Sequence, residues 1–378
     1  MERVDEFIRQ LETGNDDERY QAAELLGQIG DLNAVPELLN AYETRKGFLG
    51  VPIIEAVGEI LGRTSPNDDN SREIYSRAVD TLIEAVQDDM ADDDARAVAA
   101  EALGKSRDPK AIPVLTKQLL VGFSTKVLKA CARALRHFND PEVAHALIRV
   151  ATNKKLSENL RQAAVESLGD IRNPQAVDTL IRILEDRSDN SQIRIEAARA
   201  LGRTDDAKAI EPMIRTLESE RGSVAGTVGE AIAKALGAFR DPRVTDALVK
   251  ALAREYHIAR GASESLKKLR DRRAVEPLIR LVDPPDDKAN YRNHEREFAA
   301  QILGVLGDPR AIPALAKALH DDYCERLPQY AAESLQSFIL THPDAILRIP
   351  PDDRNLMGRF FQDAQRNELL QEICGHNG

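Results

Sequence analysis

Apolar positions spaced three and four residues apart recur along this chain, and each recurrence ends at a leucine. Near Leu168, the side chains of Arg161, Ala164, Val165 and Leu168 share one helical face and Glu166 lies opposite, which is the spacing of an amphipathic helix. The same leucine position returns every 30 to 42 residues, at Leu26, Leu61, Leu103, Leu135, Leu168, Leu201, Leu236, Leu266, Leu303 and Leu335. A period of this length is typical of stacked repeats. Each recurrence predicts the first helix of a repeat.

A polar turn follows these predicted helices, and an Asp or Asn often precedes a proline in it. The pairs are Asp108-Pro109, Asp140-Pro141, Asn173-Pro174, Asp241-Pro242 and Asp308-Pro309. A side-chain oxygen at the N-cap accepts an unpaired backbone N–H, and proline at the next position has the φ angle of a helix. The turn therefore predicts a second helix, and the apolar stripes at 177–184 and 275–282 support it.

The boundaries of the repeats predict the domain organisation. We expect residues 1–340 to form one repeat array, in which residues 1–14 match a second helix alone and form an N-terminal half-repeat cap. Prolines at 343, 350 and 351 interrupt the pattern, and residues 341–378 are expected to form a C-terminal capping segment, because a repeat array must cover its last apolar face. Phe360 and Phe361 in this segment are alternatively candidates for docking a partner.

Composition narrows the classes of partner. Aromatic residues make up 4% of the 378 residues and charged residues 30%, which suits thin two-layer packing. The net charge is −11 and the isoelectric point about 5.3, which argues against binding to nucleic acid or to an anionic membrane. Three widely spaced cysteines and the lack of a long apolar run predict a cytoplasmic protein without a disulfide framework. Its oligomeric state is open.

Repeats such as 99–115, AAEALGKSRDPKAIPVL, and 299–315, AAQILGVLGDPRAIPAL, resemble HEAT repeats, in particular the HEAT-like subclass named after phycobilisome lyases. The resemblance covers about residues 1–340. It implies an all-α fold, a right-handed α-solenoid of about ten HEAT-like repeats whose second helices line the concave face. Functionally it implies either a non-catalytic protein-interaction scaffold or, alternatively, a phycobilin lyase or phycobilisome-associated chaperone, in which Arg149, Arg182 or Arg215 would suit the propionates of a bilin.

One polar position of the second helix carries a cation in seven consecutive repeats. These residues, which we call the basic lane, are Lys117, Arg149, Arg182, Arg215, Lys250, Arg280 and Lys317. The lane is the candidate surface for a protein partner with an acidic surface. Repeat architecture offers an alternative, because acids at helical spacing could neutralise the cations: Asp186 for Arg182, Asp283 for Arg280 and Asp321 for Lys317.

Two insertions break the repeats. Residues 65–95 are expected to form a flexible acidic loop, and residues 283–297 supply Tyr291 and His294 as secondary candidates for contacts.

Little in the sequence indicates catalysis. His294-Glu295 is the only His-Glu pair, and one pair is too few for a di-iron site. Cys131 falls on the packed face and is expected to be buried rather than nucleophilic. We therefore predict no catalytic, cofactor-binding or metal-binding residues.

Overall fold

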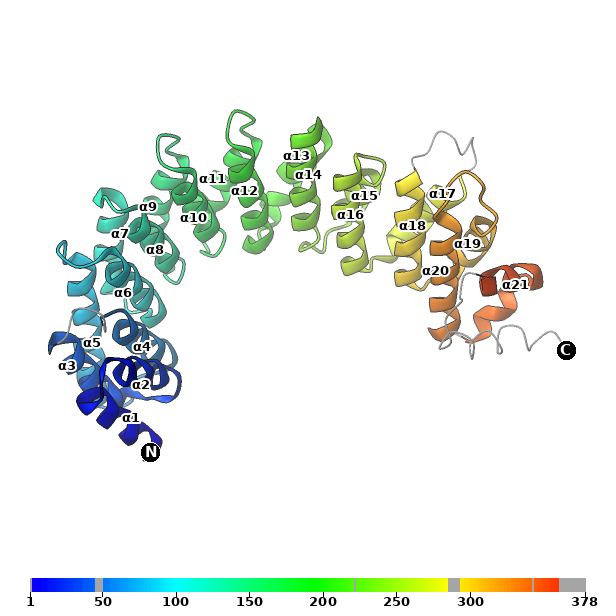
Figure 1. Cartoon of the computed structure of the whole chain (residues 1–378). Coiled ribbons are helices and arrows are strands. Elements are labelled where there is room, and N and C mark those ends of the chain that lie inside the picture. Colours follow the sequence, from blue (N-terminus) through cyan, green and yellow to red (C-terminus); the bar gives the residue numbers. More distant parts are fainter. Residues whose placement is uncertain (1, 45–49, 221, 285–292, 342, 360–378) are drawn as a thin grey trace. The chain divides into compact units, whose positions relative to one another are not determined.

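The computed structural model describes residues 2–44, 50–220, 222–284, 293–341 and 343–359. The chain divides into two compact units, residues 1–200 and 201–378, each built from stacked pairs of antiparallel helices (Figure 1). No strand occurs in the described ranges. The fold is an all-α solenoid, as predicted.

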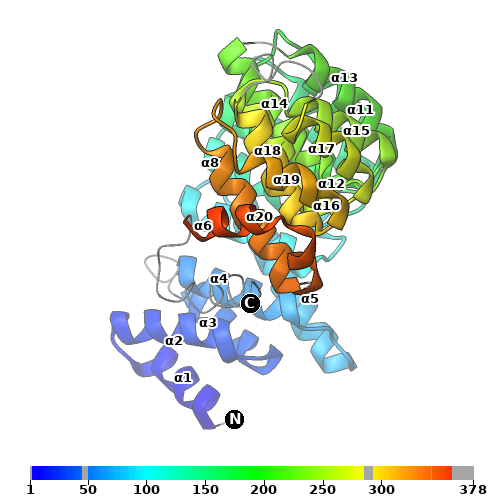
Figure 2. The ribbon, with the colours of Figure 1, turned by 90° about the vertical axis from the view of Figure 1, so that its right-hand side faces the viewer.

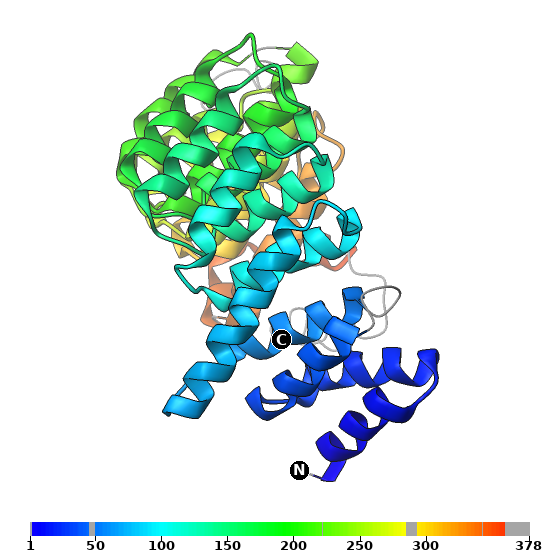
Figure 3. The ribbon, with the colours of Figure 1, turned by 90° about the vertical axis from the view of Figure 1, so that its left-hand side faces the viewer.

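In unit 1 the helices that end near the register leucines pack on one another in one layer, and the helices that follow them form the other. Figure 3 shows the helices of this unit in chain order, from blue to green. The first helices are α2 (Asp16–Ile29), α4 (Gly50–Arg63), α6 (Asp93–Ser106), α8 (Thr125–Leu135) and α10 (Glu158–Leu168). The second helices are α3 (Val35–Thr44), α5 (Asp69–Gln87), α7 (Ala111–Val121), α9 (Pro141–Thr152) and α11 (Pro174–Glu185), with the 3-10 turn η1 (Leu32–Ala34) before α3. Helix α12 (Ser191–Thr204) contains the boundary between the units.

Unit 2 repeats the same two layers, and Figure 2 shows α18 beside α20. Its first helices are α14 (Gly222–Leu236), α16 (Tyr256–Leu269), α18 (Asn293–Leu306) and α20 (Leu327–Thr341). Its second helices are α13 (Ile210–Ser219), α15 (Pro242–Ala251), α17 (Val275–Val282) and α19 (Ile312–Ala318). The 3-10 turns η2 (Ala207–Ala209), η3 (Arg272–Ala274) and η5 (Pro309–Ala311) precede α13, α17 and α19.

The register leucines hold the two layers together. All ten, from Leu26 to Leu335, have at most 1% of their surface exposed, so each contributes about the full 1.5–3 kcal/mol of a buried aliphatic side chain. The predicted N-caps are confirmed at several turns: Asp140 accepts the backbone N–H of Glu142 at 2.7 Å, and Asn173 accepts that of Gln175 at 2.8 Å. Sequence periodicity therefore located the repeats correctly.

The prediction of a flexible acidic loop over residues 65–95 is wrong. Most of this segment is α5, which begins at a capping box between Asp68 and Ser71. Its buried face carries Val79, Leu82 and Val86, each at most 1% exposed. The carboxylates lie on the outer face and in the turns of the segment. Its high acidic content is therefore compatible with an ordinary amphipathic helix.

Both ends of the array carry an extra helix. At the N-terminus α1 (Glu2–Thr13) packs on α2 and α3, and we infer that it acts as the half-repeat cap. At the C-terminus η6 (Pro343–Arg348) contacts α20 and leads into α21 (Pro351–Arg359). His320 Nε2 lies 2.6 Å from Asp353 Oδ1 and ties α21 to the turn after α19. The capping role of 341–378 stays a prediction.

Successive first helices of unit 1 touch through small residues, and one glycine makes this approach testable. A Cβ atom at Gly58 of α4 would lie 2.6 Å from the Cβ of Ala102 on α6. Overpacking costs about 1–3 kcal/mol, whereas alanine gains about 1 kcal/mol of helix propensity over glycine. We expect Gly58→Ala to lower the urea midpoint of unfolding, followed by circular dichroism, and Gly58→Ala with Ala102→Gly to recover part of the loss. A midpoint equal to or above wild type for the single variant would contradict this packing.

Candidate functional site

The structure divides the basic lane between the two units. Unit 1 holds Lys117 on α7, Arg149 on α9 and Arg182 on α11, and all three side chains are exposed near the C-terminal ends of these helices. Unit 2 holds the remaining four, which are also exposed: Arg215, Lys250, Arg280 and Lys317. Within each unit the cations occupy equivalent positions of second helices that pack on one another, α7 on α9 on α11 and α13 on α15.

Carboxylates expected to neutralise three lane cations bind other partners instead. Asp186 accepts from Lys154 at 2.6 Å rather than pairing with Arg182. Asp283 pairs with Lys317 at 2.7 Å rather than with Arg280. Asp321 is held by Arg296 at 2.6 Å. Neutralisation by a neighbouring repeat therefore holds for Lys317. The pairings predicted within the same helix are wrong, because each acid lies past the end of its helix and there binds a lysine or arginine of another segment.

Two cations of unit 1 remain free within the described part of the chain. Neither Lys117 nor Arg149 forms an ion pair with a described residue. The positions one helical turn earlier are Pro113 and His145, so no acid lies at i−4 to reduce their positive charge. Each of the other lane cations has one form of charge compensation: an acid stands four residues before Arg182, Arg215, Lys250 and Arg280, and Lys317 pairs with Asp283. Lys117 and Arg149 are therefore the two lane cations that have neither an acid at i−4 nor an ion pair with a described residue.

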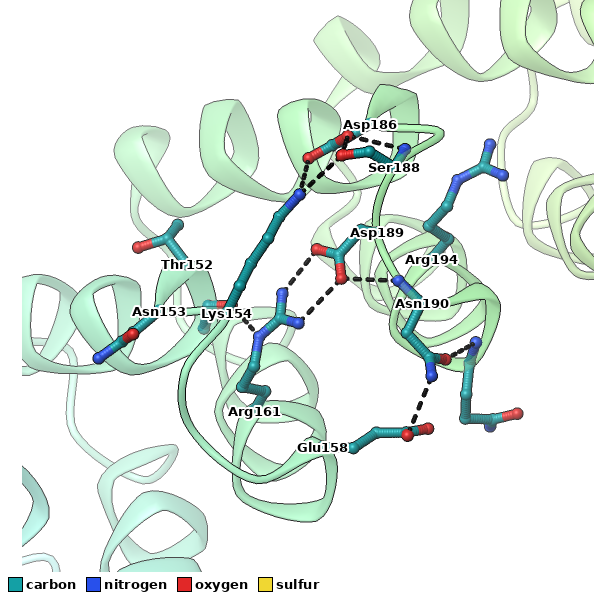
Figure 4. A network of polar contacts seen from close by, with 12 residues as sticks. Thr152, Asn153, Lys154, Glu158, Arg161, Asp186, Ser188, Asp189, Asn190 and Arg194 are labelled. Carbon is teal, nitrogen blue, oxygen red and sulfur yellow. Dashed lines mark hydrogen bonds and ion pairs between the residues drawn. The ribbon is translucent and has the colours of Figure 1, made fainter.

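A polar network at the turns that follow α9 and α11 fixes consecutive repeats of unit 1 against one another (Figure 4). Arg161 at the start of α10 donates to both carboxylate oxygens of Asp189 at 2.8 and 2.6 Å, and its Nε donates to the carbonyl of Ala151 at 3.0 Å. The Arg161 and Asp189 side chains are 6% and 4% exposed. Lys154 bridges to Asp186 and Ser188 of the next turn. The turn after α11 is thus held both by Arg161 of α10 and by Lys154 in the turn after α9.

Burial raises the pKa of Asp189, but hydrogen bonds from Arg161 and from the backbone N–H of Asn190 outweigh this effect, and its pKa is lowered overall. For Asp186 the hydrogen bonds from Lys154 and Ser188 lower the pKa to about 2. A carboxyl whose pKa is lower in the folded than in the unfolded chain stabilises the fold above the unfolded pKa. This contribution is lost as the pH falls from about 4 towards 2.

Lys154→Met is therefore expected to raise the pKa of Asp186 from about 2 towards its ordinary value of 3.8. The physical reason is that the variant removes the largest interaction that favours the charged carboxylate. A carbon-detected NMR titration of the aspartate carboxyl groups measures the shift. Lys155→Met is the matched control, since it removes the same charge one residue later. An equal shift in both variants would show that the direct Lys154–Asp186 contact is not the cause.

A buried arginine recurs seven positions before the register leucine. The helical spacing places Arg161 on the packed face, but it predicts neither the recurrence nor the partners of these side chains. The guanidinium donates to a carbonyl near the C-terminal end of the preceding helix, as Arg96 does to Val86 at 3.2 Å and Arg194 to Leu184 at 2.9 Å. The set is Arg19, Arg96, Arg161, Arg194 and Arg296, all 1–9% exposed. The recurrence of the arginine is visible when the repeats are aligned. A charged residue on an apolar helical face does not by itself reveal that it donates to the backbone carbonyls at the C-terminal end of the preceding helix.

Unit 2 contains a cluster of aromatic and imidazole rings around His294. The ring of Tyr256 on α16 lies 5.8 Å between centroids from His257, His294 and Phe298. His294 Nε2 donates to the backbone carbonyl of Arg254 at 2.9 Å. Of the secondary candidates, only His294 belongs to this cluster; Tyr291, Phe360 and Phe361 lie outside the described residues.

Catalytic groups are sparse in the described chain. No group of three or more His, Cys, Asp or Glu side chains there is arranged to hold a metal ion. Cys131 is 0% exposed, as expected, and burial raises the pKa of its thiol to about 12, so it is not a thiolate at neutral pH. None of the described helices has the length and apolar content needed to cross a membrane.

Family comparisons agree with this architecture. The PBS lyase HEAT-like repeat matches residues 18–44, 95–120 and 295–321, and HEAT repeats match residues 117–191, 153–232 and 186–265. The chain belongs to the HEAT-repeat proteins. Its repeats are of the PBS lyase HEAT-like type.

Relatives of this HEAT-repeat protein differ widely in role. Phycocyanobilin lyase subunit alpha of Picosynechococcus sp. is 41% identical over 93 residues, a match that spans 22% of this chain and 32% of the relative. Among solved structures, importin beta has a TM-score of 0.53 at 15% identity, covering 98% of this chain and 58% of importin beta. Kap95p bound to RanGDP has a TM-score of 0.56 at 13% identity, covering 94% and 54%. At these identities the structural matches show the fold alone.

Proposed function

We propose that this HEAT-repeat protein is a non-catalytic scaffold that binds a protein partner with an acidic surface through the basic lane of unit 1. The observation that carries the proposal is the exposure of Lys117 and Arg149 without an ion pair to any described residue. On an acidic chain, repeated exposed cations at equivalent positions favour encounter with a complementary partner. The aligned helices α7, α9 and α11 space the cations for an extended contact.

The direct test is the salt dependence of capture. Immobilised full-length protein is incubated with a lysate of its native organism at low salt, and bound proteins are released with rising NaCl and identified by mass spectrometry. Contacts between exposed charges weaken as the Debye length falls from about 10 Å at 0.1 M to about 3 Å at 1 M. We expect a specific acidic protein to elute by about 0.5 M NaCl. Retention of neutral or basic proteins that are insensitive to salt would count against the proposal.

A second function, handling of an open-chain tetrapyrrole, is favoured by one observation: the 41% identity to phycocyanobilin lyase subunit alpha. Under this proposal Arg149, Arg182 or Arg215 binds the propionates of the bilin, and a Tyr or His side chain donates a proton to it. The test is to mix the purified protein with phycocyanobilin and record the visible spectrum. A shifted band that Arg149→Glu weakens supports bilin handling, whereas an unchanged spectrum supports the scaffold alone.

A further inference from the structure

Two adjacent turns of unit 2, residues 238–243 and 268–273, are rich in arginine and lysine. Together they hold six cations and two carboxylates. Five of the cations are exposed and form no ion pair with a described residue: Arg240, Lys268, Arg270, Arg272 and Arg273. When Asp246 and Glu276, near the starts of α15 and α17, are counted as well, the six cations still outnumber four carboxylates. This local excess of positive charge favours an anionic ligand.

The contacts of Arg273 differ from those of the equivalent arginine in the turn before it. Arg243 folds back on Asp241, which caps its own turn, and donates to that carboxylate through Nε at 3.0 Å and Nη2 at 2.9 Å. The aspartate that precedes Arg273 by two residues, Asp271, instead accepts the hydroxyl of Thr245 at 2.7 Å. The Arg273 guanidinium therefore keeps its donors available, since it forms no hydrogen bond or ion pair with the part of the chain that the structure describes.

Arg240 and Arg273 line one hollow of about 250 Å³ between the two turns. The carboxylates in its wall already have partners: Asp241 accepts from Arg243, and Asp271 accepts from Thr245 and from the backbone N–H of Arg273. The lining itself carries equal numbers of both charges, and the remaining cations of the two turns make its surroundings positive. Two guanidinium groups are thus left to hold an anion, and their planar fork matches a carboxylate.

The size and composition of this surface favour a short acidic segment of a protein over nucleic acid. Neighbouring helices pack about 8–10 Å apart, a distance that about three extended residues span, so a few carboxylates match the excess charge. Nucleic acid continues its phosphates beyond such a surface, and an acidic chain with a net charge of −11 repels them. Stacking of bases also uses exposed aromatic rings, whereas Phe239, the one aromatic residue of the two turns, is 4% exposed.

We propose that the hollow between Arg240 and Arg273 binds a carboxylate from an acidic segment of a partner protein. Lys268, Arg270 and Arg272 contact the acidic residues on either side of this carboxylate. The surface lies where second helices of unit 2 begin, whereas the basic lane follows the C-terminal ends of second helices. The inference therefore adds a second contact surface and does not depend on the proposed function.

Fluorescence polarisation of a labelled peptide of consecutive glutamates, with the full-length protein at low salt, tests this proposal. The double variant Arg240→Gln with Arg273→Gln should weaken binding by about tenfold or more, because it removes two charge-assisted contacts. The matched control is Arg107→Gln with Arg172→Gln. These two arginines of unit 1 are also exposed and, like Arg240, directly precede an Asp-Pro or Asn-Pro pair. We expect the control to keep the wild-type dissociation constant within about twofold, since distant charges are screened.

Equal affinity of wild type and of the Arg240 and Arg273 double variant would overturn the inference, as would undetectable binding of the peptide to wild type. Tighter binding of a labelled single-stranded oligonucleotide than of the peptide would also overturn it, by making nucleic acid the ligand. The variant Lys117→Glu, Arg149→Glu and Arg182→Glu separates this surface from the basic lane. If that variant loses the peptide and the double variant retains it, the peptide binds the lane, and the proposed function stands without this inference.

Discussion

Replacing Asp321 with alanine is expected to destabilise the last repeats by about 3–5 kcal/mol, the cost of leaving one charge of a buried ion pair without its partner. The Arg296 and Asp321 side chains are 1% and 0% exposed, and the guanidinium donates to both carboxylate oxygens at 3.1 and 2.6 Å. Asp321 also accepts the backbone N–H of Tyr323 at 3.1 Å and of Cys324 at 3.0 Å. Its removal leaves the guanidinium and two backbone donors without this acceptor.

Hydrogen exchange followed by mass spectrometry localises this effect. Because each repeat contacts only its neighbours, we expect faster exchange in peptides from 293–341 and little change in peptides from 93–168. Asp322→Ala is the control, since Asp322 is exposed and a surface substitution usually changes stability by no more than about 0.5 kcal/mol. Equal exchange in Asp321→Ala and Asp322→Ala would show that the buried pair does not hold these repeats together.

Reversing the three lane cations of unit 1 is expected to have the largest effect on binding. In the triple variant Lys117→Glu, Arg149→Glu and Arg182→Glu, an acidic partner meets like charges, which cost several kcal/mol. Since 1.4 kcal/mol corresponds to tenfold in affinity, we expect a loss of about a hundredfold or more, measured by calorimetric titration. Of the three, Arg182 alone has a side-chain hydrogen bond or ion pair with a described residue to lose, its 3.1 Å hydrogen bond to Thr179, so the thermal midpoint should stay nearly unchanged.

A second triple variant controls for net charge. Arg107, Arg133 and Arg172 are exposed residues of unit 1 at the opposite end of the repeats, where first helices end. Reversing these three to Glu changes the total charge by the same amount. Affinity for the partner should fall only slightly in this variant, because charges beyond about 10 Å are screened at 0.1 M salt. Equal losses in the two triple variants would show that total charge, and not the lane, governs binding.

Hydrophobic periodicity was sufficient to predict the helical repeats. The register leucines and the Asp-Pro turns are local signals, and both are confirmed, down to the N-caps at Asp140 and Asn173. The error over residues 65–95 had a physical cause, since acidic residues on one helical face dominate the composition of a segment without preventing the other face from packing. For such segments the spacing of apolar residues therefore predicts secondary structure better than the overall composition does.

Contacts between repeats were harder to predict, because they depend on which turns face one another after folding. Asp186 lies four residues after Arg182, yet Lys154 binds it from 32 residues away. The ring cluster at Tyr256 and the exposed Phe123 also depend on placement, since the chain has few aromatic residues and their spacing shows no period. Predicting which side chains pair across repeats therefore requires the three-dimensional structure.

The most direct test of the proposed scaffold compares two baits in one experiment. Wild-type protein and the triple variant Lys117→Glu, Arg149→Glu and Arg182→Glu are immobilised in equal amounts and exposed to the same lysate of the native organism, and the bound proteins are quantified by mass spectrometry. We predict that at least one acidic protein is depleted tenfold or more on the triple variant, and that it remains bound to the control variant at Arg107, Arg133 and Arg172. Equal amounts of the same proteins on wild type and on the triple variant would contradict partner binding through the basic lane.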